Sequence, residues 1–193
     1  ERKGSKTGLI TTAGFRDILE MRRRDRPETW GLRGSYTPVI PRDMRIEVEE
    51  RVLADGSVRT VVDTAAVTAA ARQLLDAGAE ALAIMFVNSY ANAANERAAL
   101  DAVRTIWPNG HITVSSDILP ELREFERAST TALNATLQPV IGRYLQNLET
   151  SLAAAGFDGD ILIVQSNGGV MSVDTAREVP VRTALSGPAA GVI

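Results

Sequence analysis

Hydrogen-bonding side chains and glycines are concentrated in two short segments near the C-terminus. The first, Gln165-Ser166-Asn167-Gly168-Gly169, supplies two side-chain amides and one hydroxyl. None of these groups is a strong acid, base or nucleophile at neutral pH, so they would orient a polar, uncharged ligand through hydrogen bonds. A tight turn before Val170-Met171 is the alternative interpretation.

The second segment, Ser186 to Gly191, has the composition of a turn that leads into a helix. Serine can cap a helix, and proline suits the first helical positions. Small residues such as Gly187 and Gly191 permit close packing or the approach of a phosphate. The segment has no lysine, so it is not a P-loop.

Both segments follow apolar stretches, the unbroken aliphatic run 161–164 and a second stretch, 179–185. Such stretches are typical of parallel strands that are buried on both faces. Ligands of open parallel sheets bind outside the carboxyl ends of the strands. We therefore expect the two segments to lie close together and to form part of a binding cleft.

A third group of polar residues forms a stripe along the long helix predicted over 119–155. Its members recur at spacings of three and four residues. They are Glu124, Arg127, Thr131, Asn134 and Gln138, with Glu126, Ser129, Thr130 and Thr136 beside them. Hydroxyl and amide side chains are poor helix formers, and surface helices normally carry lysine and glutamate instead. The stripe indicates either the sheltered wall of a cleft or domain interface, or a satisfied structural network beneath a loop.

The elements that must position these residues follow from alternating strand and helix patterns. Strands are expected at 7–12, 81–87 and 111–115, and helices begin after Asp63 and Asn92. This order predicts an α/β fold with a mostly parallel sheet and right-handed βαβ crossovers. Pro139 predicts a kink or two abutting helices near Gln138.

Asp55-Gly56 lies between two strand-like stretches, 45–53 and 58–62, and is a strong hairpin signal. We expect a β-hairpin over 42–62 that projects from the core, because its apolar residues alternate with charged ones. The preceding residues, 27–41, contain several prolines and glycines and are expected to form an irregular connection.

Composition excludes several classes of protein. The 193 residues are 45% hydrophobic and 23% charged, as in an ordinary globular protein. A net charge of −3 gives no overall basic field for nucleic acid or an anionic membrane. Without cysteine, and with His111 as the one histidine, this chain cannot build a disulfide or the usual zinc site alone, and we assign no metal ligands. No apolar stretch reaches membrane-spanning length, and a cytoplasmic location is expected.

Taken together, the motifs resemble the A subunit of hydantoinases and the related 5-oxoprolinases, over essentially the whole chain. The matching segments are Arg2-Lys3-Gly4, Gly8-Leu9-Ile10-Thr11-Thr12, Gly14-Phe15-Arg16-Asp17, Pro41-Arg42, Val48-Glu49-Glu50-Arg51, Asn88-Ser89-Tyr90, Leu119-Pro120-Glu121, Glu126-Arg127, Ser129-Thr130-Thr131, Asn134, Gln165 to Gly169 and Ser186 to Gly191. Many relatives carry histidine where this chain has Asn88, so a proton-transfer role at that position is not expected.

The resemblance implies a piece of an actin-like ATPase (ribonuclease H-like) fold. It also implies ATP-dependent opening of a cyclic amide, such as hydantoin, N-methylhydantoin or 5-oxoproline, through a phosphorylated intermediate. ATP and Mg would be the cofactors, and a second (B-type) subunit or domain and a homo-oligomer would be the partners. Both phosphate-binding loops would lie outside this chain, so residues 1–193 are expected to be an incomplete α/β domain from the N-terminal half of a larger enzyme. Its sheet would continue beyond both ends, and the isolated fragment would be inactive.

With this family in mind, we expect the substrate side of the cleft to be lined by Glu126, Arg127, Thr130, Asn134, Ser166 and Asn167. Contacts near the nucleotide are expected from Ser186, Gly187 and Gly191. Catalytic residues are not identified. Two alternatives stay open. One is an ATP-coupled carboxylase subunit acting on acetone or acetophenone, which shares these motifs. The other is a non-enzymatic assembly module whose polar stripe is an interface.

Overall fold

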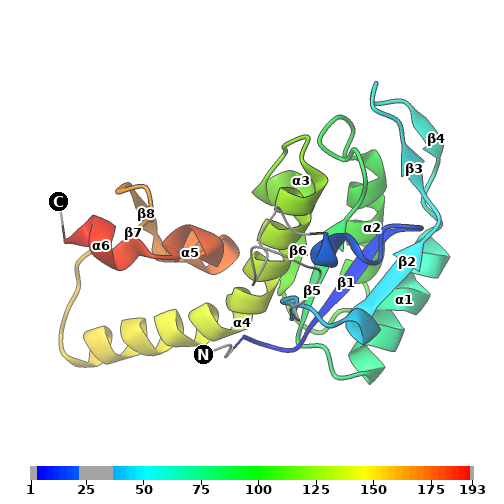
Figure 1. Ribbon diagram of the computed structural model, residues 1–193. Coiled ribbons are helices and arrows are strands. Elements are labelled where there is room, and N and C mark those ends of the chain that lie inside the picture. The colour runs from blue at the N-terminus through cyan, green and yellow to red at the C-terminus, as the bar shows by residue number, and fades with distance from the viewer. Residues whose placement is uncertain (1–3, 22–36, 192–193) are drawn as a thin grey trace.

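A four-stranded parallel sheet forms the centre of the structure, in the order β2-β1-β5-β6 (Figure 1). The computed structural model describes residues 4–21 and 37–191. The strands of the sheet are β1 (Thr7–Thr12), β2 (Arg45–Val48), β5 (Ala81–Met85) and β6 (Ile112–Val114). Every residue of β1 and β5 is buried, as expected for central parallel strands with helices on both faces. The α/β fold with a parallel sheet is therefore confirmed.

Helices cover both faces of this sheet (Figure 1). On one face, α1 (Thr64–Asp76) packs against α2 (Ala94–Arg104), and on the other lie α4 (Glu124–Ala154) and the short α3 (Ser115–Ile118). Asp63 caps α1 as predicted, because its carboxylate accepts a hydrogen bond from the Ala65 N–H at 2.9 Å. Gly78 ends the helix with φ +85°, a conformation that favours glycine.

The projecting hairpin is present, but it is shorter than the predicted 42–62. It consists of β3 (Arg51–Val52) and β4 (Val58–Thr60), which pair antiparallel around Asp55-Gly56. The residues before it form the 3₁₀ helix η2 (Arg42–Met44) and then β2, which is the parallel edge strand of the main sheet. The buried guanidinium of Arg45 donates to the Ile40 carbonyl at 2.7 and 3.0 Å, and these bonds let a charged residue enter the core.

The long helix α4 continues through Pro139 as a single helix, so two abutting helices are not formed. Figure 1 shows that its axis changes direction partway along its length, in agreement with the kink expected from proline. The first part of α4 packs on the sheet, and the second part runs past it. Of the predicted connection 27–41, residues 27–36 lie outside the described residues, and 37–41 contain no helix or strand.

The C-terminal segment differs from the prediction. The stretch 161–164 was expected to be a buried parallel strand. It forms β7 (Leu162–Val164), which pairs antiparallel with β8 (Val170–Ser172) in a separate ribbon beside the distal part of α4 (Figure 1). The stretch 179–185 forms the 3₁₀ helix η3 (Pro180–Thr183) instead of a strand, since Pro180 fixes φ and lacks an N–H for a ladder. Leu162 and Leu185 are 59% and 87% exposed, so this part of the chain supplies no layer that would bury them.

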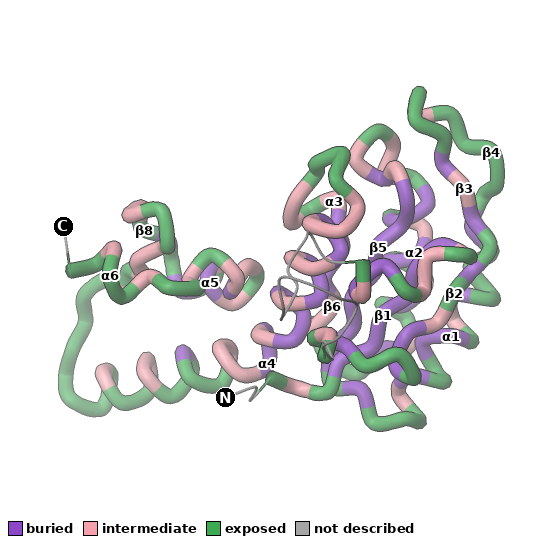
Figure 2. Tube along the Cα trace, viewed as in Figure 1, coloured by how far each residue is buried: buried purple, intermediate pink, exposed green. Residues whose placement is uncertain are grey.

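The remaining elements are η1 (Ile18–Glu20), α5 (Val173–Glu178) and α6 (Ser186–Ala190). The described residues form two separate clusters of buried apolar side chains. The larger surrounds the sheet, where Figure 2 shows most of the buried stretches of the chain, and the smaller joins α4 to the ribbon through Leu145, Met171, Val173 and Ala176. Among the described helices, none is both long enough and apolar enough to cross a lipid bilayer.

Candidate binding site at the carboxyl edge of the sheet

The carboxyl ends of β1 and β5 meet at the point where the strand order reverses, because the chain passes from β1 to β2 on one side and later to β5 on the other. In open α/β sheets this edge is where ligands bind. Here the edge is built from Thr12 at the end of β1, Phe86 and Val87 after β5, and Ser115 after β6. Two buried carboxyl groups, Glu50 and Glu96, hold these strand ends together.

Glu50 is only 3% exposed and links the hairpin to β1. Its Oε1 accepts a short hydrogen bond from the Thr12 hydroxyl, and its Oε2 accepts one from Asn95 Nδ2 at 2.8 Å. The Thr12 oxygen in turn accepts the Val87 N–H at 2.9 Å. Burial raises the pKa of the Glu50 carboxyl, while the bonds from Thr12 and Asn95 act in the opposite direction.

Glu96 is fully buried and joins the ends of β5 and β6. Its Oε1 accepts the Phe86 N–H at 2.8 Å and the Ser115 hydroxyl at 2.6 Å, and its Oε2 accepts the Ser116 N–H at 2.9 Å. Three donors on one carboxylate are an arrangement that compensates for burying a charge. Glu96 is therefore a structural anchor of this edge and does not face the cavity described next.

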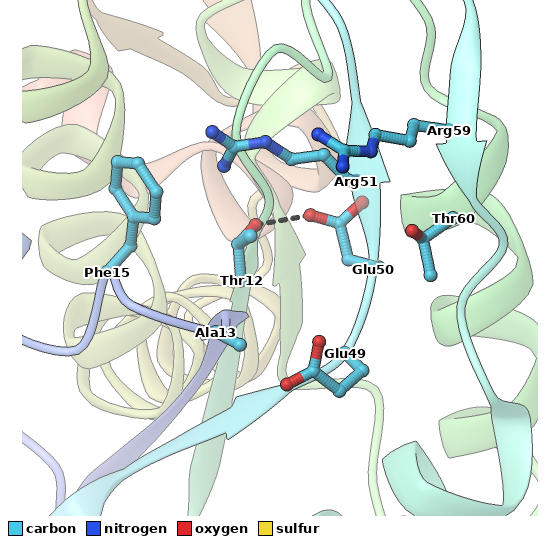
Figure 3. Close-up of a pocket in the computed structure, with 8 residues that line it drawn as sticks. All are labelled: Thr12, Ala13, Phe15, Glu49, Glu50, Arg51, Arg59 and Thr60. Carbon is cyan, nitrogen blue, oxygen red and sulfur yellow. Dashed lines mark hydrogen bonds between the residues drawn. The ribbon is translucent and has the colours of Figure 1, made fainter.

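A cavity of about 350 Å³ opens between the end of β1 and the hairpin (Figure 3). It is lined by Thr12, Ala13, Phe15, Glu49, Glu50, Arg51, Arg59 and Thr60. Its volume is within the range of small-molecule sites. Guanidinium donors, a threonine hydroxyl and one buried carboxyl line it, so the cavity is suited to binding and orienting a small polar molecule.

Three asparagine side chains fix the hairpin that forms the outer wall of this cavity. Asn88, Asn92 and Asn95 follow β5 and donate to the carbonyls of Val52, Gly56 and Thr60, each at 2.9 Å. Asn88 adopts φ +59°, a left-handed conformation that asparagine tolerates better than most residues. The loop after β5 and the first turn of α2, which contains Asn95, thus hold the hairpin in place against the carboxyl edge.

Arg127 is the predicted site residue that reaches this edge. Its side chain is completely buried and donates to the carbonyls of Phe86 at 2.9 Å and Glu121 at 2.8 Å. Its guanidinium lies 5.5 Å from the centre of the Tyr90 ring. Burial lowers the pKa of Arg127, and the nearby Glu96 charge opposes that shift. Its Nε has no hydrogen-bond partner among the described residues.

Asn134 lies further along α4 and forms a joint between three elements. Its Nδ2 donates to Thr113 Oγ1 and to the Glu178 carbonyl, both at 3.1 Å, and its Oδ1 accepts the Val181 N–H at 3.2 Å. The neighbouring stripe residue Gln138 also donates to the Glu178 carbonyl, at 3.0 Å. Glu126 and Thr130 are half-buried. In the described residues, this part of the stripe therefore acts as an internal hydrogen-bond network.

The other predicted residues lie on the ribbon. The exposed Ser166 donates from both its N–H and its hydroxyl to the Arg182 carbonyl, at 2.8 and 3.1 Å, and Asn167 Oδ1 accepts the Gly169 N–H at 2.9 Å. Three further predicted residues are at α6, namely Ser186, Gly187 and Gly191. The two glycine-bearing segments are close together, because Arg182 belongs to η3 just before α6. They follow an antiparallel strand and a 3₁₀ helix, however, and not two parallel strands.

The nine predicted residues therefore do not form one site: Arg127 reaches the carboxyl edge, Asn134 lies further along α4, and five others lie on the ribbon and α6. Sequence reasoning missed the cavity residues, chiefly Glu50, Arg51 and Arg59. The signal was present in Thr11-Thr12, which ends a buried strand just before Gly14. The expectation that ligands bind at the carboxyl ends of parallel strands pointed to 161–164 and 179–185, which are not parallel strands.

Comparison with known proteins agrees with the fold and with the motifs. Residues 1–107 match the hydantoinase/oxoprolinase N-terminal region, and residues 127–193 match the hydantoinase/oxoprolinase family. Caprolactamase subunit alpha of Pseudomonas jessenii is 34% identical over 98% of this chain and 28% of its own length. The 5-oxoprolinase of Saccharomyces cerevisiae is 30% identical over 100% of this chain and 17% of its own length.

Solved structures give the same result. The crystal structure of the ATP-dependent caprolactamase from Pseudomonas jessenii matches with a TM-score of 0.88 and 33% identity, over 96% of this chain and 27% of that one. Nucleotide-free acetone carboxylase matches with a TM-score of 0.82 and 27% identity, over 99% of this chain and 28% of that one. Both likenesses are consistent with an actin-like ATPase-type fold. The chain spans between 17% and 28% of the length of these relatives, and it belongs to the hydantoinase/oxoprolinase family.

Proposed function

We propose that this chain forms the substrate side of an ATP-dependent hydrolase that opens a cyclic amide, such as a hydantoin, 5-oxoproline or another lactam. The observation that carries the proposal is the polar cavity at the carboxyl edge of the parallel sheet, in a chain of this family. Relatives named as a caprolactamase and a 5-oxoprolinase act on cyclic amides, which supports this class of substrate.

In this proposal the residues around the cavity bind and orient the ring, and we assign none of them to bond cleavage. Arg51 and Arg59 offer N–H donors to carbonyl or carboxylate oxygens, and Phe15 offers a flat wall. Burial raises the pKa of Glu50, and Thr12 and Asn95 donate to its two oxygens, so this side chain holds the cavity wall in place. Orientation of this kind raises the rate of a following chemical step by reducing the entropy lost on the way to the transition state.

ATP would supply the phosphoryl group that activates the amide. Ser186, Gly187 and Gly191 remain our proposal for contacts near the nucleotide. A Cβ added at Gly187 would meet no atom within 4 Å, so its backbone is open to a ligand. The described residues contain no cluster of three or more acidic or histidine side chains that could hold a metal ion, and we place no magnesium ligand among them.

The test is substrate-stimulated release of phosphate by the full-length protein. Hydantoin, N-methylhydantoin, 5-oxoproline and caprolactam would each be added with ATP and magnesium, and ring-opened product would be measured in parallel. We expect at least one of them to stimulate phosphate release in proportion to ring opening. If none of the four does so, the hydrolase proposal is refuted.

A second candidate function is a subunit of an ATP-coupled ketone carboxylase. The specific observation in its favour is the TM-score of 0.82 to acetone carboxylase across 99% of this chain. ATP turnover that requires bicarbonate together with acetone or acetophenone, and that ignores every lactam, would favour this function. Named relatives are subunits of larger assemblies, so co-purification of a second subunit is expected under both proposals.

A further inference from the structure

Two arginines line the cavity at the carboxyl edge, and among the described residues neither has a carboxylate partner. Arg51 on β3 and Arg59 on β4 are neighbours across the hairpin, where Arg51 pairs with Thr60. Both line the cavity, and Figure 3 shows their side chains extending across the same side of it. Within residues 4–21 and 37–191, neither forms a salt bridge, and Arg51 instead lies over the Phe15 ring, 5.3 Å from its centre.

Among the described residues, the two acidic side chains of the cavity form no salt bridge with these guanidinium groups. Both carboxyl oxygens of Glu50 are already engaged by Thr12 and Asn95. Burial raises the pKa of Glu50, and the charge of Arg51 is a smaller effect in the opposite direction. Figure 3 shows the Glu49 carboxylate on the far side of Glu50 from the arginines. Two like charges that share a small cavity repel each other, and a bound anion would relieve that repulsion.

We propose that Arg51 and Arg59 bind a planar oxyanion in this cavity, either the carboxylate of a small organic molecule or bicarbonate. A guanidinium presents parallel N–H donors that match the two oxygens of such a group. The ring of Phe15 keeps the Arg51 plane oriented, and about 350 Å³ is sufficient for a single-ring ligand. The inference rests on the proposed function and deepens it, since it favours a lactam that carries a carboxylate, as 5-oxoproline does, over a neutral one.

The experiment measures direct binding by isothermal titration calorimetry in a chloride-free buffer, with the full-length protein. The ligands are 5-oxoproline, bicarbonate and 2-pyrrolidinone, which is the same ring without the carboxylate. The proteins are the wild type, Arg51→Gln, Arg59→Gln and the control Arg72→Gln, which removes an equal charge from an exposed position on α1. Arg59 is itself exposed, so its replacement should not affect folding. Circular dichroism would verify this for each variant.

We expect Arg51→Gln and Arg59→Gln each to raise the Kd for at least one of the two anions by about tenfold, and Arg72→Gln to change it by less than twofold. The Kd for 2-pyrrolidinone should change by less than twofold in all variants. If 5-oxoproline binds through the arginines, the oxyanion is the carboxylate of an organic substrate. If only bicarbonate binds through them, the oxyanion is bicarbonate. Anion binding that is equal in all four proteins, or absent in the wild type, would overturn the inference.

These outcomes are separate from those of the proposed function. If a neutral lactam stimulates phosphate release while no anion binds through the arginines, the hydrolase proposal stands and the oxyanion site does not. If the anion binds through the arginines but no lactam stimulates phosphate release, the site stands and the hydrolase proposal fails.

Discussion

Replacing Glu96 by glutamine should destabilise the protein markedly, although the two side chains have nearly the same shape. The carboxylate accepts three hydrogen bonds, from Phe86 N, Ser115 Oγ and Ser116 N, and it is fully buried. If the amide oxygen of glutamine keeps the first two, its NH₂ group faces the Ser116 N–H, and two donors then oppose each other. The reverse orientation leaves the Phe86 N–H without an acceptor, whereas the Ser115 hydroxyl can rotate to accept from the amide.

The magnitude follows from this geometry. A buried donor that loses its acceptor costs about 1–3 kcal/mol, and hydrogen bonds to a neutral oxygen are weaker than those to a carboxylate. Relief of the cost of burying a charge offsets part of this loss. We therefore expect the free energy of unfolding to fall by about 2–3 kcal/mol. With a urea m-value of about 2–3 kcal/mol/M, the unfolding midpoint should fall by roughly 1 M.

Urea unfolding followed by circular dichroism at 222 nm would measure the effect. Asp101→Asn is the matched control, because it makes the same chemical change on the exposed side of the same helix, α2, where Asp101 has only a loose contact with Arg104 at 3.8 Å. That variant should change stability by less than about 0.5 kcal/mol. If Glu96→Gln were as mild as its control, the idea that this carboxylate anchors the strand ends would be wrong.

Three further predictions concern other parts of the structure. Asn134→Ala should lower stability by about 2–3 kcal/mol, because it leaves the Val181 N–H without its acceptor. It should also speed hydrogen exchange in η3 by more than in β5, and equal acceleration in both would contradict the role of Asn134 as a local joint. Glu50→Gln should gain stability relative to the wild type as pH rises. A raised carboxyl pKa means that the folded wild type binds more protons than the unfolded chain, so its stability falls between the unfolded and the folded pKa. The free energies of unfolding of Glu50→Gln and the wild type, measured at pH 4.5 and pH 8, test this prediction. A difference between the two proteins that is the same at both pH values would refute it. Asn88→Gly should lose only the bond to the Val52 carbonyl, whereas Asn88→Ala should also carry the strain of φ +59°, about 1 kcal/mol more. Thermal melts of the two variants should therefore rank glycine above alanine.

The sheet half of the structure could be predicted because its signals are local. The apolar stretch 81–87 is long enough to identify a strand buried on both faces, and single residues such as Asp63 and Gly78 specify where α1 begins and ends. The hairpin turn also has a local signal, the Asp55-Gly56 dipeptide. What local signals could not show was that the strand before the turn pairs with β1. In the structure that strand begins with the buried Arg45, whose guanidinium donates to the carbonyls of Ile40 and Arg16 and to the Glu20 carboxylate, contacts that a local strand pattern does not reveal.

The ribbon could not be predicted for a different reason. An aliphatic stretch such as 161–164 indicates that a strand there could be buried. Whether it is buried depends on which other elements pack over it. In the described residues, β7 finds only β8 and the distal part of α4 as neighbours, and Leu162 remains exposed. The stretch 161–164 does form a strand, but the prediction that this strand lies in the centre of a parallel sheet is wrong.

The carboxyl edge itself shows how a site can be assembled from residues that are individually unremarkable in sequence. Thr12, Glu50 and Asn95 are 38 and 45 positions apart, yet one carboxyl group receives hydrogen bonds from both neighbours. Asparagines at 88, 92 and 95 then hold the hairpin by its carbonyls, and that hairpin carries Arg51 and Arg59. Because the bonds run to backbone atoms, the residues of the hairpin can change without moving it. The loop after β5 and the start of α2 fix the position of the cavity wall, and under the proposed function the side chains on β3 and β4 would determine which ligand the cavity accepts.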